Sequence, residues 1–413
     1  MRSGEEAGPI RVLAVDHTAG VVPFRRKFAA LAARPGIDLT VLAPERWIEN
    51  YAEIRLEART PIRTDRYFLR SGPVVWPGYE NRGFFVSGMS NAIRASDPHI
   101  LHLWEEPFSL IALQALWLQG RLAPRAKAIF FSSDNLSRDF RYVYRPSWFY
   151  ARVERYAHRR CVAGTAVSRE VEDVLRAKGY RGPIEVVPHG LDLADYPERR
   201  GDTRAAAARY GLVPPVVGYL GRLTEQKGVD TLLRAFATLS GSSSLAPTPT
   251  LAVVGDGPAK ASLLTLAASL GLAERVRFLP SVPHADVPTV LRAMDVLVLP
   301  SRTTPRLREQ FGRVLIEGMA AGCVVIGSSS GAIGDVIGDA GLVFPEENPE
   351  ALAASLKRAL WEPELAESLR GKGRERVRSR YTWDAIAERL VGLYRSVLAP
   401  DPGASAGSAS ARG

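Results

Sequence analysis

The stretch EQFGRVLIEGMAAGCVVIGSSSG, residues 309–331, predicts a helix that leads directly into a buried strand, CVVIGS (323–328). Another apolar run, DVLVLP (295–300), stands shortly before it. Near-continuous apolar strands joined through helices are typical of parallel sheets that are covered on both faces. This stretch therefore predicts an α/β fold.

The same alternation extends over most of the chain, in two series. The strand candidates are 11–16, 38–43, 100–104, 127–131, 164–168 and 184–188 in the first half, and 216–221, 251–255, 275–279, 295–300, 323–328 and 342–344 in the second. Two such series predict two doubly wound, Rossmann-like domains that face each other across a cleft. Ligands of these sheets bind beyond the carboxyl ends of the strands, so we expect the functional residues directly after strands.

The domain boundaries follow from changes in composition. We expect an N-terminal domain at 1–200 and a C-terminal domain at 213–380, because the polar segment 197–215 ends in prolines before a new strand. Further expected features are helices at 230–239, 288–295 and 383–399, a long surface loop at 240–250 and a disordered tail at 400–413.

Composition excludes several classes of protein. No apolar run is long enough to span a bilayer, and the first ten residues have no apolar core behind a basic leader, so we expect a cytoplasmic protein. The two cysteines, Cys161 and Cys323, are too few for a disulfide scaffold or a structural zinc site. The net charge of +10 comes mostly from arginine and can simply reflect a GC-rich coding sequence. The alternative is a partner that carries phosphate, and the positions of the cations must decide.

Two cations follow the first strand of the second half, in GYLGRLTEQKG (218–228). Arg222 and Lys227 lie on a loop before a helix that we expect to begin near Gly228. A helix N-terminus with two added cations favours an anion, and a diphosphate suits them better than a carboxylate. The alternative is a solvated loop with two ordinary surface cations.

The next loop, GDGPAK (255–260), is a tight turn in which Pro258 is expected to open a helix. Gly255 there indicates only a loop at the carboxyl edge of the sheet. No GxGxxG follows the first strand of either half, which counts against an NAD enzyme.

Glu317 stands inside the apolar face of the helix predicted after residue 312, where an unpaired carboxylate would be costly. Glu309 lies eight positions earlier, on the preceding loop. Carboxylates accept hydrogen bonds from paired hydroxyls such as those of ribose and hexose, so the two acids could bind different parts of one elongated ligand. The alternative for Glu317 is a buried ion pair with Arg222 or Arg313. The backbone amides expected to face the same ligand are those of Gln310, Phe311 and Gly312.

Together, GRLTEQKG, VVGDGP, VRFLPSVP and the stretch 309–345 resemble the retaining glycosyltransferases of family 4, which have the GT-B fold. The resemblance implies that Arg222 and Lys227 bind the diphosphate of a nucleotide sugar, that Glu309 contacts the transferred sugar and that Glu317 contacts the ribose. It also implies that the segment 276–282 lines the base and that the last helix returns to the first domain. The other residues assigned to the donor side are Gly20, Gly255, Val282, Gln310, Phe311, Gly312 and Arg313.

The first half departs from the family. The loop after its first strand supplies only Gly20, where relatives have a glycine-rich turn. Relatives often show His-x-His after the fourth core strand, and this chain reads His102, Leu103, Trp104, followed by Glu105 and Glu106. We assign His102, Trp104 and Glu105 to the acceptor side, with Glu106 as a further candidate. The alternative for His102 is a core histidine.

The segment 137–161 mixes arginines with aromatic residues. It could lie on an anionic membrane, or it could be a helix with its aromatics packed inward and a solvated basic face.

The resemblance implies retaining transfer of a hexose from a UDP- or GDP-sugar to an acceptor hydroxyl. The acceptor could be a glycan, a lipid-linked precursor or a small molecule. No DxD motif is present, so we expect neither a metal nor a cofactor beyond the nucleotide sugar. The rivals are a sugar phosphorylase, an oxidoreductase and a nucleic-acid-binding module. Charge alone supports the last, and we expect no nucleic acid as partner.

Overall fold

The computed structural model describes residues 8–20, 22–49, 52–56, 62–64, 66–79, 81–136, 146–197, 203–240, 248–305 and 307–400. The chain divides into two compact units. Unit 1 contains the residues up to Val167, Val171–Val187 and those from Ile386 onward; unit 2 contains Ser168–Glu170 and Pro188–Ala385. The middle of the loop predicted at 240–250, the tail after residue 400 and the first part of the segment 137–161 lie outside the described residues.

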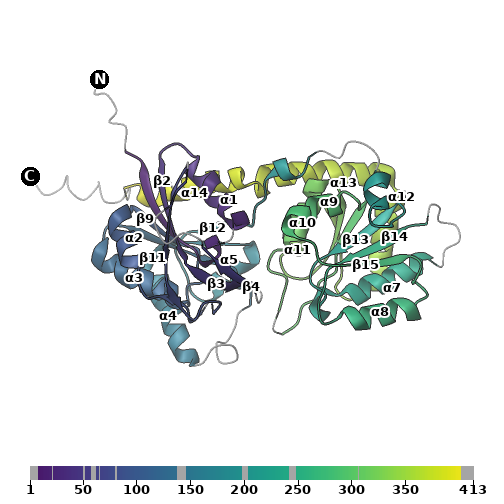
Figure 1. The fold of residues 1–413 in the computed structure, drawn as a ribbon, viewed down its shortest axis with the longest axis horizontal. Helices are drawn as coiled ribbons and strands as arrows, with labels where there is room; N and C mark the ends of the chain where they lie inside the picture. The colour runs from purple at the N-terminus through teal and green to yellow at the C-terminus, as the bar shows by residue number, and fades with distance from the viewer. Residues whose placement is uncertain are drawn as a thin grey trace, which may run out of the picture. The chain divides into compact units, whose positions relative to one another are not determined.

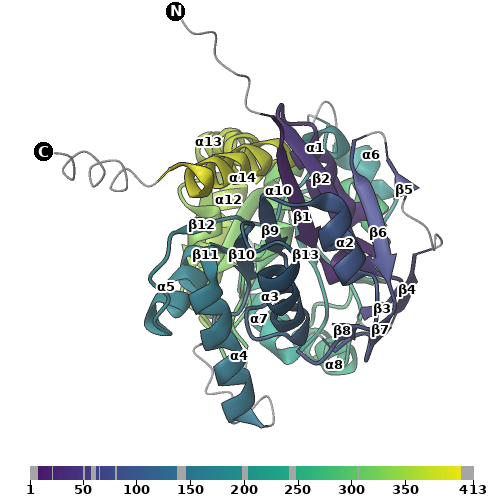
Figure 2. The same ribbon diagram turned by 90° about the vertical axis from the view of Figure 1, so that its left-hand side faces the viewer.

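Unit 1 is built on one sheet whose strands run in the order β12-β11-β10-β9-β1-β2-β6-β5, as Figure 2 shows. Its strands are β1 (Ile10–Val15), β2 (Ile37–Pro44), β5 (Ile62–Arg63), β6 (Phe68–Gly72), β9 (Ile100–Leu103), β10 (Lys127–Ser132), β11 (Cys161–Ala166) and β12 (Ile184–Val186). All neighbours pair in parallel except β5 and β6. The central strand β9 is buried along its whole length, as its mostly apolar sequence ILHL predicts.

Helices cover both faces of this sheet (Figure 1). α2, α3, α4 and α5 lie on one side, and α1 and α14 lie on the other. Their bounds, with that of the last helix, are α1 (Arg26–Ala32), α2 (Met89–Ser96), α3 (Leu110–Leu122), α4 (Ser147–Arg160), α5 (Arg169–Ala177) and α14 (Trp383–Leu398). α14 packs on β9, because the Tyr394 hydroxyl lies 2.8 Å from Nδ1 of His102.

Two short antiparallel pairs in unit 1 were not predicted. They are β3 (Arg46–Glu49) with β4 (Ala52–Arg55), and β7 (Val74–Val75) with β8 (Phe84–Phe85). The pair β3–β4 follows β2 in the chain, and the pair β7–β8 follows β6. Both pairs therefore come after the carboxyl ends of parallel strands of the sheet.

Unit 2 has a fully parallel sheet in the order β15-β14-β13-β16-β17-β18. Its strands are β13 (Val216–Leu220), β14 (Thr250–Val254), β15 (Val276–Leu279), β16 (Val296–Leu299), β17 (Val324–Ser328) and β18 (Gly341–Phe344). Its helices are α6 (Thr203–Ala208), α7 (Val229–Ser240), α8 (Lys260–Ser269), α9 (Val287–Leu291), α10 (Arg313–Ala321), α11 (Ile333–Ile337), α12 (Pro349–Trp361) and α13 (Pro363–Arg376). The two doubly wound α/β sheets agree with the predicted fold class.

Two helix boundaries differ from the prediction. α9 ends at Leu291 and not at residue 295, because both the backbone amide and the side chain of Asp295 bond to the backbone of Val216, at 2.8 Å each. α8 begins at Lys260 and not at Pro258, because the amide of Ala259 donates to the carbonyl of Leu223, at 3.0 Å. In both places hydrogen bonds to residues far away in the chain shorten the helix that the local sequence predicted.

Candidate functional site

Loops that follow β13, β14 and β16 meet through their backbones at the carboxyl edge of the unit 2 sheet. A Cβ atom at Gly255 would lie 1.9 Å from the carbonyl oxygen of Gly221, and one at Gly228 would lie 2.0 Å from that of Pro300. Gly228 also has a φ of 62°, which only glycine adopts without strain. The glycines therefore serve close packing between the loops, which holds the side chains on them in fixed positions.

Lys227 and Glu309 form an ion pair at this edge. Lys227 closes the short helix η5 (Glu225–Lys227), and its Nζ lies 2.6 Å from Oε2 of Glu309. The Ser301 hydroxyl, just after β16, donates to the same oxygen at 2.7 Å. The structure thus brings together the first acid and one of the two cations that the sequence assigned to a common ligand. Ser301 was not predicted.

The N-terminus of α10 lies beside this ion pair in the chain. Gly312 is its N-cap residue, with a left-handed backbone (φ 75°, ψ 56°), and no side chain caps the helix. The first amides of a helix have no partner within it, and α10 adds its positive dipole end there. The buried ring of Phe311 packs against His189 and Tyr381, at centroid distances of 5.3 and 5.7 Å. Residues 310–312 therefore offer backbone donors on a fixed support, whereas the Phe311 side chain belongs to the core.

Glu317 is buried and paired with Arg313, one turn earlier on α10. Arg313 Nε lies 3.0 Å from Glu317 Oε1, and the Glu317 side chain is 6% exposed. Burial raises the pKa of the Glu317 carboxyl above its ordinary value, although the Arg313 guanidinium acts in the opposite direction. Arg313 Nη2 also lies 3.0 Å from Nε2 of His284. The ion pair kept open as an alternative for Glu317 is thus present, with Arg313 and not Arg222 as the partner.

Arg222 has a different environment. Its side chain is exposed and, within the part of the chain that the structure describes, forms neither an ion pair nor a hydrogen bond. Its carbonyl accepts a hydrogen bond from the Tyr219 hydroxyl at 2.8 Å, which holds the backbone of the loop. An exposed guanidinium on a held loop is available to a ligand.

Arg302 is a further cation that sequence reasoning missed. Its Nη2 lies 2.5 Å from Oδ1 of Asp230, and its amide donates to the carbonyl of Gln226 at 2.8 Å. It ties the loop after β16 to the start of α7 and so supports the segment that carries Lys227. Its position shortly after an apolar strand is the feature of the sequence from which it could have been predicted.

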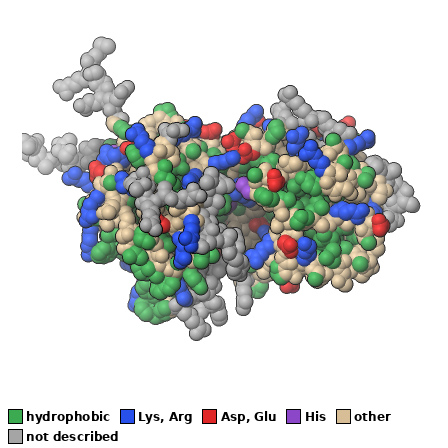
Figure 3. Space-filling model, viewed as in Figure 1, with side chains coloured by type: hydrophobic (Ala, Val, Ile, Leu, Met, Phe, Trp, Pro, Cys, Tyr) green, Lys and Arg blue, Asp and Glu red, His purple; other side chains and the backbone are tan. Residues whose placement is uncertain are grey.

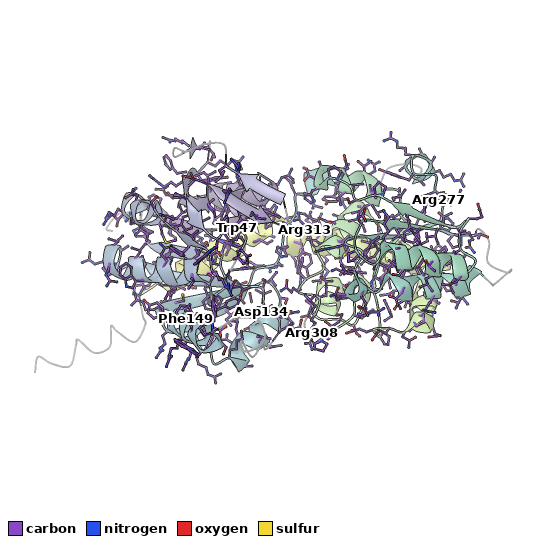
Figure 4. The ribbon with its side chains drawn as sticks, turned by 60° about the horizontal axis from the view of Figure 1, so that its bottom comes forward. Trp47, Asp134, Phe149, Arg277, Arg308 and Arg313 are labelled. Carbon is purple, nitrogen blue, oxygen red and sulfur yellow. The ribbon has the colours of Figure 1, made fainter. Side chains whose placement is uncertain are left out.

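The remaining predicted donor residues of unit 2 lie on separate loops. Val282 is half-buried between β15 and the short helix η6 (His284–Asp286), and Gln310 is partly exposed before α10. In Figure 4, Arg277 near the start of β15 lies well apart from Arg313 on α10. The segment 276–282 runs from there toward the carboxyl edge of the sheet, because Nε2 of His284, two residues after Val282, lies 3.0 Å from Nη2 of Arg313.

In unit 1, charged pairs gather at the carboxyl ends of β1 and β9. Nδ1 of His17 lies 2.9 Å from Oε2 of Glu105, and Nζ of Lys27 lies 2.6 Å from Oδ2 of Asp16. Burial alone would raise the pKa of Asp16, but Lys27 and His17 outweigh it and the pKa lies below its ordinary value. Sequence reasoning singled out Glu105 but missed the other three residues, two of which come directly after the first strand.

His102 has the surroundings of a core histidine, the alternative stated for it. It is fully buried, with Nδ1 at 2.8 Å from the Tyr394 hydroxyl and Nε2 at 3.3 Å from that of Thr165. Burial lowers its pKa to about 3, so the ring is neutral. Trp104 is buried beneath Lys27, whose Nζ lies 4.1 Å from the ring centroid.

Two further residues of unit 1 are held by hydrogen bonds from neighbouring residues. Gly20, in the short helix η1 (His17–Gly20), accepts a hydrogen bond from Arg25 at 2.9 Å. Glu106 accepts hydrogen bonds from the amide and hydroxyl of Ser133, at 2.7 and 2.9 Å, and burial raises its pKa to about 7. Glu106 thus joins the loop after β9 to the loop after β10.

Comparison with known proteins gives two adjoining family matches. The family described as Glycosyltransferase Family 4 matches residues 20–195, and the family described as Glycosyl transferases group 1 matches residues 208–376.

Among curated proteins, a D-inositol 3-phosphate glycosyltransferase of Segniliparus rotundus is 35% identical over 225 residues, which are 52% of this chain and 47% of that protein. An alpha-D-kanosaminyltransferase of Streptomyces kanamyceticus is 29% identical over 252 residues, 59% of this chain and 63% of that protein. The chain spans about half the length of the first curated relatives it matches.

Solved structures show the fold. The sucrose-phosphate synthase of Thermosynechococcus elongatus has a TM-score of 0.66 at 21% identity, over 95% of this chain and 99% of that one. The Anabaena protein HepE in complex with UDP has a TM-score of 0.68 at 17% identity, over 94% of this chain and 100% of that one.

Proposed function

The chain belongs to the family 4 glycosyltransferases of the GT-B fold, and on this premise we propose that it transfers a hexose from a nucleoside-diphosphate sugar to an acceptor hydroxyl, with retention of configuration. The observation that supports the donor site most directly is the convergence of Lys227, Glu309 and Ser301 at the carboxyl edge of the unit 2 sheet.

We assign the diphosphate to Arg222, Lys227 and the N-terminus of α10. An ammonium group has three donors, so the ion pair with Glu309 leaves Lys227 able to bind a phosphate oxygen as well. The exposed guanidinium of Arg222 can bind a phosphate in a fork, and the uncapped helix start adds amide donors. These groups supply the positive charge that a diphosphate needs, and on this ground we propose that transfer requires no metal.

We assign the two acids to hydroxyl groups of the donor. Glu309 lies nearest Lys227 and would accept hydrogen bonds from the transferred sugar. Glu317 lies deeper, and a carboxylate has about four acceptor positions, so its ion pair with Arg313 leaves room for the ribose hydroxyls.

In the proposed reaction the C1–O bond to the diphosphate breaks and a bond from C1 to the acceptor oxygen forms on the same face. The acceptor proton passes to a departing phosphate oxygen. Negative charge therefore grows on the diphosphate in the transition state, where Arg222, Lys227 and the α10 amides stabilise it.

Two acceptor classes have support. The names of the curated relatives, which include D-inositol 3-phosphate glycosyltransferase, favour a small polar metabolite. A glycan or lipid-linked glycan precursor is the other class that we propose, and peripheral contact with a membrane would accompany it. A sugar phosphorylase of the same fold is the alternative activity, and it would release or consume free phosphate.

The donor is tested by thermal stabilisation of the purified protein with a panel of UDP-, GDP- and ADP-sugars, beginning with UDP-glucose. A bound donor at one hundred times its Kd stabilises the protein by about 2.7 kcal/mol and raises Tm measurably. Arg222→Ala should reduce the shift without abolishing it, because Lys227 and the α10 amides still bind the diphosphate. If no nucleotide sugar raised Tm, or if product analysis showed sugar phosphate instead of nucleoside diphosphate, the proposed activity would be wrong. Proton NMR of the product reads the anomeric configuration directly.

A further inference from the structure

α4 carries an unusual exposed stripe. Trp148, Arg152, Arg155 and Arg159 recur at every third or fourth position, so they share one face of the helix, and all four are exposed. Trp148 is 59% exposed, whereas tryptophan side chains in folded proteins are on average mostly buried. The sequence alone left open whether these aromatics pack inward; in the structure Tyr150 does and Trp148 does not.

The opposite face of α4 packs against the body of unit 1. Tyr150, Val153 and Ala157 are buried there. Glu154 is also buried on that side, and its Oε1 lies 2.9 Å from Nζ of Lys178. The single acid of α4 is therefore already neutralised inside the unit and does not offset the arginines of the stripe.

The neighbouring helix α3 repeats the pattern. Trp117 is 49% exposed, and the guanidinium of Arg121, one turn later, lies 3.6 Å from the centroid of its ring. On α4, Arg152 lies over Trp148 in the same i, i+4 relation, at 5.0 Å. The two helices lie side by side, and Nη2 of Arg160 bonds to Oε1 of Gln119 at 3.0 Å.

We name this the α3–α4 surface; its exposed members are Trp117, Arg121, Arg125, Lys127, Trp148, Arg152, Arg155, Arg159 and Arg160. Within residues 110–127 and 146–160 the one acid is Glu154, which faces inward. Elsewhere, on the face shown in Figure 3, Lys and Arg side chains are scattered among acidic and apolar ones in both units. The α3–α4 surface differs because it unites exposed indole rings with unopposed positive charge.

We propose that the α3–α4 surface docks on the anionic headgroups of a lipid bilayer. Arginine heads attract the surface to lipid phosphates, and tryptophan, which is apolar with one polar end, favours the headgroup level. Trp148, exposed at the start of α4, is the apolar side chain that would insert, and its ring stands edge to face at 6.1 Å from Phe149, which packs against the buried Phe108 and Tyr150. The proposal assigns the membrane contact named with the lipid-linked acceptor class to a defined surface, and it rests on that surface and not on the proposed reaction.

Nucleic acid is the competing partner for such a charge, and the geometry disfavours it. Aromatic side chains bind single strands by stacking bases on their rings. One face of the Trp117 ring is already covered by Arg121 at 3.6 Å, and Arg152 lies over Trp148. An arginine–tryptophan pair can still enter the headgroup region together, because the guanidinium then reaches a phosphate while the ring stays against acyl chains.

The α3–α4 surface is separate from the charged pairs at the carboxyl edge of unit 1. The ring of His17 lies 4.7 Å from that of Trp47, which marks that edge. Figure 4 labels Trp47 and Phe149 well apart within the unit. Substitutions on the surface can therefore be read without disturbing the residues assigned to the acceptor side.

The test is flotation of the full chain with vesicles of phosphatidylcholine alone and of phosphatidylcholine with phosphatidylglycerol, without any nucleotide sugar. We expect binding to the anionic vesicles only, weakened by salt. Arg152→Glu, Arg155→Glu and Arg159→Glu together should lower the affinity at least about 100-fold, since each basic residue near an anionic surface contributes substantially. The matched control reverses three exposed cations of unit 2, Arg234, Lys357 and Arg358, and should keep nearly all of the binding.

A second variant tests the insertion of the indole rings. Trp117→Ala with Trp148→Ala keeps every charge, so it should still bind at low salt but lose the quenching of tryptophan fluorescence by brominated lipid. Circular dichroism confirms folding of each variant. Equal loss in the unit 2 control, unchanged binding of the triple variant, or binding to DNA oligonucleotides but not to vesicles would each overturn the proposal. Because no substrate is present, such a failure leaves the proposed transferase activity untouched.

Discussion

Replacing Arg222 by alanine should separate catalysis from stability. The side chain is exposed and unpaired within the described part of the chain, and the hydrogen bond from Tyr219 uses only its carbonyl. Folding stability should therefore change by no more than about 0.5 kcal/mol. If Arg222 stabilises the charge that grows on the leaving diphosphate, its loss should lower turnover about 100-fold to 1,000-fold, or about 2.7–4 kcal/mol of transition-state free energy.

Two measurements check this prediction. Release of nucleoside diphosphate under saturating donor and acceptor gives kcat, and chemical denaturation gives stability. Arg222→Lys keeps the charge but not the fork, so its kcat should lie between those of the wild type and Arg222→Ala. Arg234→Ala removes another exposed arginine of unit 2 and should change neither quantity. A well-folded Arg222→Ala variant with near-normal kcat would refute the assignment of Arg222 to the diphosphate.

Other predictions concern backbone packing and pH. Gly228→Ala should destabilise unit 2 by at least about 2 kcal/mol, because its Cβ would lie 2.0 Å from the Pro300 carbonyl oxygen. Gly371→Ala, in α13 with open space around it, should instead stabilise the protein by about 0.5–1 kcal/mol. Denaturation midpoints measure both changes, and equal effects would contradict the packing argument. Burial raises the pKa of Glu106 to about 7, so the folded state holds a proton that the unfolded state releases above its ordinary pKa of 4.5, and stability should fall as pH rises between those values. Glu106→Gln should flatten this decline in a pH series of denaturation curves, and an unchanged slope would assign the decline to other groups.

The core strands could be predicted because burial on both faces leaves a plain signal in the sequence. The run VLVL (296–299) is apolar throughout, and ILHL (100–103) is apolar except for His102; the structure has strands at both. The short pairs β3–β4 and β7–β8 carry no such signal. They are two to four residues long and lie among glycines, prolines and arginines, and their pairing partners are set by tertiary contacts.

The candidate site divides in a similar way. Arg222, Lys227, Glu309 and the start of the helix at Gly312 could be found because they lie on loops that connect a strand to a helix. Ser301 and Arg302 were overlooked, although they too follow a strand, because their types are common on surfaces and only the structure shows their bonds to Glu309 and Asp230. The role of Glu317 with the ribose stays a prediction.

The sequence by itself predicted two doubly wound α/β sheets, because hydrophobic periodicity is a local property, and its strand-end motifs carry the resemblance to the family 4 glycosyltransferases. Only the tertiary structure decided which charges meet. Arg313 and not Arg222 pairs with Glu317, His102 is sealed in the core by Tyr394 and Thr165, and Trp148 faces outward with three arginines. The physical reason is that a hydrogen bond, an ion pair or the burial of a ring depends on the distance between residues far apart in the chain, and no local pattern encodes that distance.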